Sequence, residues 1–119
     1  MERPPPCPGP TIRMTRSYYR IQYPVADRPR FMVDGIAHEV LDCSESGMRY
    51  RLATDEPAMY GQEIRGLVQF RRGTEIQVEG RIVRIDGEFA ALHFNALGIP
   101  FGIILAEQRD LLRRYPMWR

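Results

Sequence analysis

The feature that most restricts the fold of this chain is the alternation of apolar and polar residues in short segments joined by tight turns. Phe31 and Val33 alternate with Arg30, Met32 and Asp34, and the same period resumes from 36 to 44 after the Asp34-Gly35 pair. Successive side chains of a strand point to opposite faces, so this period predicts strands with one buried face. Asp-Gly is a dipeptide that tight hairpin turns favour. The middle of the chain is therefore expected to be an antiparallel β structure.

Four further segments extend the same pattern, at 48–52, 66–70, 75–85 and 89–94. A second Asp-Gly pair, at 86–87, predicts another hairpin. The apolar phase of the long segment changes between Ile82 and Val83, which indicates a bulge or strong coiling. Six short strands with tight turns imply a small barrel or a sandwich.

The two ends of the chain differ from this middle part. Positions 1–15 are rich in proline, which favours extended backbone and predicts a flexible arm. The remaining 16–119 form one domain, with a barrel at about 29–96 and an amphipathic helix at about 100–115 that Pro116 stops. The residues that repeat at helical spacing are Phe101, Ile104, Leu105, Gln108, Leu111, Leu112 and Tyr115.

Composition restricts the classes of partner. The 119 residues suffice for one soluble domain, and a net charge of +2 from 17 basic and 15 acidic side chains is too near balance for coating a nucleic-acid polymer. No apolar run approaches the ~18 residues of a membrane span, and the N-terminus lacks a signal segment. We expect no membrane insertion and a cytoplasmic location. Arg109, Arg113 and Arg114 suit the C-terminal end of the helix dipole and are assigned a structural role.

Motifs for catalysis or metal binding are absent from the sequence. It lacks the nucleotide-binding glycine loops, the zinc-protease helix motif and the nucleophile elbow. Cys7 and Cys43 belong to no C-x-x-C pair or Cys/His cluster. His38 and His93 lie on different predicted strands and have the pattern of ordinary polar residues. We expect neither an enzyme, nor a metal site, nor a cofactor.

Two clusters of charged and polar residues are the remaining candidates for ligand binding. The first lies where the arm meets the barrel. Arg16 and Arg20 are four residues apart, so their guanidinium groups can converge on one anion. Guanidinium pairs bidentately with phosphate and matches O6 and N7 of guanine. Tyr18 and Tyr19 between them more often pack on a core than bind a ligand, and their role stays open.

The second cluster lies at the end of the segment 36–44. Asp42 and Ser44 are two apart and project from the same face of a strand. A carboxylate can accept hydrogen bonds from N1–H and N2–H of guanine. Gly47 follows where the chain turns, and its missing Cβ permits a positive φ or the close approach of a ligand. Each cluster by itself also fits an ordinary charged or polar surface.

Together, in this order and on this strand pattern, the clusters resemble the two signatures of the PilZ domain family, R-x-x-x-R and [D/N]-x-S-x-x-G. The resemblance covers roughly 14–116, including the strand at 78–84 and the helix segment 107–116. It implies an all-β fold, a six-stranded antiparallel β-barrel (a split barrel) with a C-terminal helix. It also implies binding of the bacterial second messenger cyclic di-GMP.

The resemblance also implies a role for each site residue. The arginines would grip a phosphate and a guanine edge, the polar pair would fix the same guanine, and the glycine would let the base lie close. Thr15 stands where a second arginine affects whether one nucleotide or a stacked pair is held, and Arg13 is two further back. The ligand-binding residues implied are Arg16, Arg20, Asp42, Ser44 and Gly47.

The leading hypothesis is therefore a non-enzymatic cyclic di-GMP receptor that signals through an unidentified protein partner. The alternative is a protein-interaction adaptor of the same family that binds no nucleotide, against which the complete motifs argue. A barrel for single-stranded nucleic acid is disfavoured, because it needs a basic groove with exposed aromatic residues. Affinity, nucleotide stoichiometry, oligomeric state and pathway stay open.

Overall fold

A computed structural model of the protein describes residues 20–116. The predictions for the arm, for Arg13, Arg16, Tyr18 and Tyr19, and for Cys7 lie outside the described residues. The strands are β1 (Ile21–Gln22), β2 (Arg30–Val33), β3 (Ile36–Cys43), β4 (Gly47–Arg51), β5 (Glu63–Gln69), β6 (Glu75–Asp86) and β7 (Phe89–Leu97). A short 3-10 helix, Val25–Asp27, follows β1, and helix α2 (Phe101–Arg114) follows β7.

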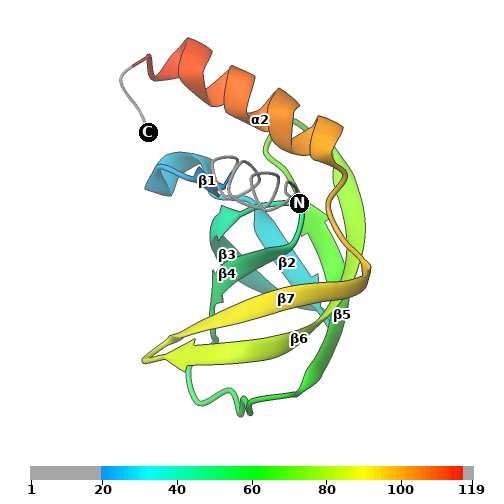
Figure 1. Ribbon diagram of the computed structural model, residues 1–119. Helices are drawn as coiled ribbons and strands as arrows, with labels where there is room; N and C mark the ends of the chain where they lie inside the picture. The colour runs from blue at the N-terminus through cyan, green and yellow to red at the C-terminus, as the bar shows by residue number, and fades with distance from the viewer. Residues whose placement is uncertain (1–19, 117–119) are drawn as a thin grey trace, which may run out of the picture.

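The strands close into an antiparallel barrel (Figure 1). Hydrogen-bonded neighbours run in the order β3, β2, β5, β6, β7 and β4, and β4 pairs again with β3. The expected six-stranded barrel with a C-terminal helix is thus confirmed. β1 is an additional strand beside the last residues of β3, with Ile21 opposite Cys43. Sequence alternation did not indicate β1, because two residues are too few to display a period.

The turns and the bulge follow the local sequence. Asp34 and Gly35 have φ angles of 50° and 83°, the left-handed pair that a two-residue hairpin turn requires. The register between β6 and β7 shifts between Ile82 and Arg84, as the change of apolar phase indicated. Val83 is the bulged residue and is exposed on the outside of the barrel.

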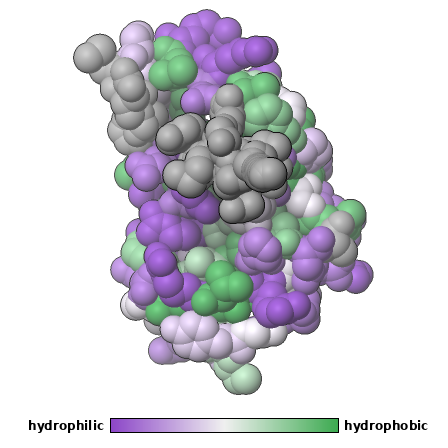
Figure 2. Space-filling model, viewed as in Figure 1, coloured by the Kyte–Doolittle hydropathy of each residue, from purple (hydrophilic) through white to green (hydrophobic). Residues whose placement is uncertain are grey.

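The barrel is filled by one side of each strand. The Phe31 and Tyr50 rings meet edge to face at 5.1 Å, and His38 packs against Tyr50 at 5.3 Å. The ring nitrogens of His38 bond the Phe31 carbonyl and the Glu56 carboxylate, so this histidine is a packed core residue. Outside, hydrophilic residues predominate on the face that Figure 2 shows, with smaller hydrophobic areas between them. Other members of the core are Val40, Met48, Val68, Val78, Ile82, Ala90 and Leu92.

Helix α2 lies across one end of the barrel (Figure 1). Ile104, Glu107 and Leu111 are its buried residues. Phe101 and Leu112, which the helical spacing placed with the apolar residues, are exposed instead. In the part of the chain that the structure describes, no helix is both long and apolar enough to cross a membrane.

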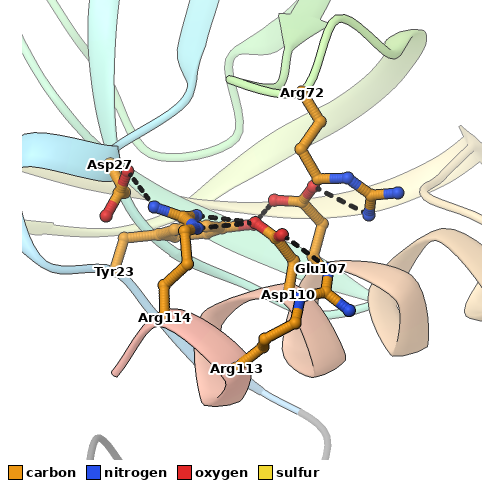
Figure 3. Close-up of polar contacts among 7 residues, drawn as sticks. All are labelled: Tyr23, Asp27, Arg72, Glu107, Asp110, Arg113 and Arg114. Atoms are coloured by element: carbon orange, nitrogen blue, oxygen red, sulfur yellow. Dashed lines mark hydrogen bonds and ion pairs between the residues drawn. The ribbon is translucent and has the colours of Figure 1, made fainter. Parts of the chain in front are cut away.

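Polar contacts explain the orientation of the helix (Figure 3). The Tyr23 hydroxyl donates a 2.8 Å hydrogen bond to Glu107, which places a carboxylate on the buried face of α2. Near the end of the helix, Arg114 donates to Asp110 at 2.6 Å and to Asp27 at 2.8 Å. The structure thus gives Arg114 a structural role through ion pairs, in the last turn of the helix where a cation also suits the helix dipole.

Candidate functional site

One row of residues crosses five neighbouring strands on the outside of the barrel. Each member of the row is the register partner of the next. Residues directly opposite in antiparallel strands project from the same face, so their side chains stand together. We call this set the outer row. It consists of Gln22 of β1, Asp42 of β3, Arg49 of β4, Ala91 of β7 and Arg84 of β6.

The outer row lines a hollow of about 440 Å³, to which Arg20 and Val83 also contribute. Ala91 lies between two arginine-bearing strands. Its small side chain leaves space there that a larger residue would fill. The row therefore forms a shallow site with a small residue in its floor and long cationic side chains at its sides.

Asp42 is the most enclosed member of the row, with only 2% of its side chain exposed. Arg20 Nη1 donates to its Oδ1 at 2.5 Å, and Arg49 Nε donates to its Oδ2 at 2.7 Å. Each carboxylate oxygen thus has its own guanidinium partner, in charge-assisted hydrogen bonds. The structure brings Arg20 and Asp42, one residue from each sequence motif, into direct contact.

The hollow carries an excess of positive charge. Its lining includes Arg20, Arg49 and Arg84 against a single carboxylate, Asp42. Arg84 donates through Nε to Asp86 at 2.7 Å, and Asp86 does not line the hollow. Such a surface favours an anionic ligand. Among the described residues no group of His, Cys, Asp or Glu is placed to hold a metal ion.

Ser44 and Gly47 are not among the residues that line the hollow. Ser44 N–H donates to the Gly47 carbonyl at 2.8 Å, and its hydroxyl lies 3.2 Å from that of Ser46, so both residues shape the turn between β3 and β4. A Cβ on Gly47 would lie 2.5 Å from the Leu92 carbonyl oxygen of β7. The close approach that needs glycine here is therefore that of a neighbouring strand. Contact of these two residues with a ligand stays a prediction.

Arg49 and Arg84 belong to the site although the motifs did not include them. The strand alternation places Arg49 on the opposite face from the buried Met48 and Tyr50. This outward position is the only indication of a site role that the sequence gives for Arg49. Nothing local indicates that β4 and β6 both lie beside β7. Their convergence on Ala91 follows from the barrel register alone.

Comparison with known proteins agrees with this architecture. A family model, the PilZ domain, matches residues 14–116. No curated protein matches the chain. Among solved structures, the Bacillus subtilis Inhibitor of motility (MotI/DgrA) superposes with a TM-score of 0.58 at 17% identity, over 81% of this chain and 49% of that one. The chain therefore spans about half of that protein, and the likeness concerns the fold.

PilZ domains are binding domains, not enzymes, and the family is one of cyclic di-GMP receptors. Its signatures are present here as Arg16-x-x-x-Arg20 and Asp42-x-Ser44-x-x-Gly47. Because the family model covers nearly the whole sequence and the barrel with its C-terminal helix has the family fold, this chain belongs to the PilZ domain family.

Proposed function

We propose that this protein is a receptor that binds cyclic di-GMP in the hollow over the outer row and signals through a protein partner. The observation that supports it most is the contact between Arg20 and Asp42 in a positively charged hollow. Cyclic di-GMP carries two phosphodiester groups and two guanines, which an arginine-rich site with one carboxylate complements. A cytoplasmic location is part of this proposal.

The proposed binding step is an exchange of partners at Asp42. Arg20 is 41% exposed and immediately precedes β1, so it can turn from the carboxylate to a phosphate or to O6 and N7 of guanine. The released Oδ1 of Asp42 then accepts from N1–H and N2–H of the same guanine. Arg16, Ser44 and Gly47 complete the proposed contacts on the strength of the family motifs.

The proposed signal to the protein partner starts at the segment that contains Arg20. Arg20 is three residues before Tyr23, which is bonded to Glu107 of α2. A ligand that moves Arg20 therefore acts on backbone that contacts the helix. We propose that the position of this segment relative to α2 reports occupancy to the partner.

Calorimetric titration with cyclic di-GMP tests the receptor function, with GMP and GTP as controls. We expect a Kd of about 1 μM or tighter, about −8 kcal/mol, and a loss of at least about tenfold in Arg20→Ala. Arg65→Ala is the matched control, because Arg65 also pairs with a carboxylate on the barrel exterior, Glu79, but does not line the hollow. Absence of binding by the wild type would favour the adaptor. Equal affinities of the two variants would contradict the role of Arg20.

A further inference from the structure

The two arginines that flank Ala91 are held in the same way. Arg49 donates through Nε to Asp42, and Arg84 donates through Nε to Asp86, both at 2.7 Å. Within residues 20–116, no acceptor bonds the terminal nitrogens of either side chain. Each guanidinium is thus anchored at one nitrogen and has its two terminal NH2 groups available to a ligand.

The positions of the two arginines, as well as their hydrogen bonds, favour binding of one ligand group by both. Arg49 and Arg84 are both register partners of Ala91, so their backbones are two strand spacings apart, about 10 Å. Long side chains at that separation can converge on one group placed over Ala91. Both line the same hollow, which confirms that they face a common space.

We propose that Arg49 and Arg84 form a second phosphate-binding subsite over Ala91, distinct from the Arg20 end of the hollow. A fixed guanidinium fork binds phosphate well because little side-chain freedom remains to be lost. This inference rests on the proposed function and makes it more specific. One phosphodiester of the ligand lies near Arg20 and the other between Arg49 and Arg84.

The subsite explains how the barrel would select a dinucleotide. From Asp42 to Arg84 the outer row crosses three strand spacings, about 14 Å. A ligand with one phosphodiester, such as cyclic GMP, can satisfy only one end of this row. The second subsite therefore contributes to affinity for cyclic di-GMP and not to affinity for cyclic GMP.

Arg84→Ala is the direct test, because Arg84 touches neither motif. Arg65→Ala is its control: the two side chains are 60% and 65% exposed, and each pairs with one carboxylate. Calorimetry should show cyclic di-GMP binding about tenfold weaker in Arg84→Ala and unchanged in Arg65→Ala. Cyclic GMP should bind both variants like the wild type. Equal cyclic di-GMP affinities, or an equal loss for both ligands in Arg84→Ala, would overturn the subsite.

Ala91→Glu provides a second, independent test. It places a carboxylate between the two guanidinium groups, where it should occupy the subsite in place of a phosphate. We expect at least a tenfold loss of cyclic di-GMP affinity with an unchanged or higher Tm. Undiminished binding would overturn the subsite. A wild type that does not bind cyclic di-GMP contradicts the proposed function and the subsite with it, whereas a binding wild type with unaffected variants contradicts the subsite alone.

Discussion

The end of strand β3 contributes to a polar cluster on each of its two faces, and the two clusters differ in kind. Asp42 and Cys43 are adjacent in β3, yet Asp42 belongs to the outer row and Cys43 to the core. The inner cluster consists of Tyr23, Cys43 and Glu107, where the Tyr23 hydroxyl contacts both the thiol at 3.8 Å and the carboxylate at 2.8 Å. Both clusters hold one buried carboxylate.

The difference lies in the partners of that carboxylate. Asp42 is bound by Arg20, whose side chain is 41% exposed and is proposed to turn to a ligand, and by Arg49, which is 37% exposed and stays anchored through Nε. Glu107 is bound by the buried Tyr23, with Arg72 at 3.8 Å. Burial raises the pKa of Tyr23, and it raises the pKa of Cys43 to about 12, so both stay protonated. We therefore assign the Asp42 cluster to the proposed ligand binding and the hydrogen bond between Tyr23 and Glu107 to holding α2 on the barrel.

The largest effect is expected from removing the centre of the inner cluster. Tyr23→Ala deletes a buried ring between the barrel and α2 and leaves Glu107 without its donor, which should lower the free energy of unfolding by about 3–5 kcal/mol. Urea denaturation measures this loss. Val25→Ala, two residues along and exposed, should change stability by less than about 0.5 kcal/mol. Similar losses in both variants would contradict a stabilising inner cluster.

An intermediate effect, on binding instead of stability, is expected for the outer row. Asp42→Ala removes the carboxylate that we propose as the guanine acceptor and should weaken cyclic di-GMP binding by about 10- to 100-fold. The two arginines it releases are partly exposed and return to water, so the free energy of unfolding should fall by only about 1 kcal/mol. Calorimetry measures the loss of affinity and urea denaturation measures the loss of stability on the same preparation. The comparison fails if Asp42→Ala destabilises as much as Tyr23→Ala.

The smallest effect concerns the pH dependence of stability. Burial raises the pKa of Glu107 above its ordinary value of about 4.5, and the Tyr23 hydrogen bond opposes this only in part. A carboxyl group with a raised folded pKa stabilises the fold below the unfolded pKa, and this contribution is lost as pH rises through the folded pKa. The unfolding free energy of the wild type should therefore fall relative to that of Glu107→Gln as pH rises above about 4.5, by at most about 1.4 kcal/mol per pH unit.

Denaturation series at several pH values check this sign. Glu75→Gln is the control, because Glu75 is an exposed strand residue bonded to Gln69. This variant measures the effect of removing a carboxylate that is not buried. A Glu107→Gln curve that runs parallel to that of the wild type would show that the inner carboxylate is not held in a desolvated state.

Within the fold, the predictable parts were those that depend on neighbouring residues. The left-handed turn at Asp34-Gly35 and the bulge after Ile82 follow from dipeptide preference and from the phase of alternation. The buried side of α2 was only partly predictable. Glu107 can be buried there because Tyr23, 84 positions away in the chain, donates a hydrogen bond to it. The helical spacing of apolar residues cannot indicate a donor so distant in sequence.

For the candidate site, the sequence alone determined the barrel strands other than β1, the alternation that turns Asp42 and Arg49 outward, and the two motifs of the family. These are properties of one strand or one turn, fixed by local backbone geometry. Only the tertiary structure decided that Asp42, Arg49, Ala91 and Arg84 stand in one row and that Arg20 reaches Asp42. The reason is that register between strands is set when the barrel closes, by contacts between residues far apart in the chain.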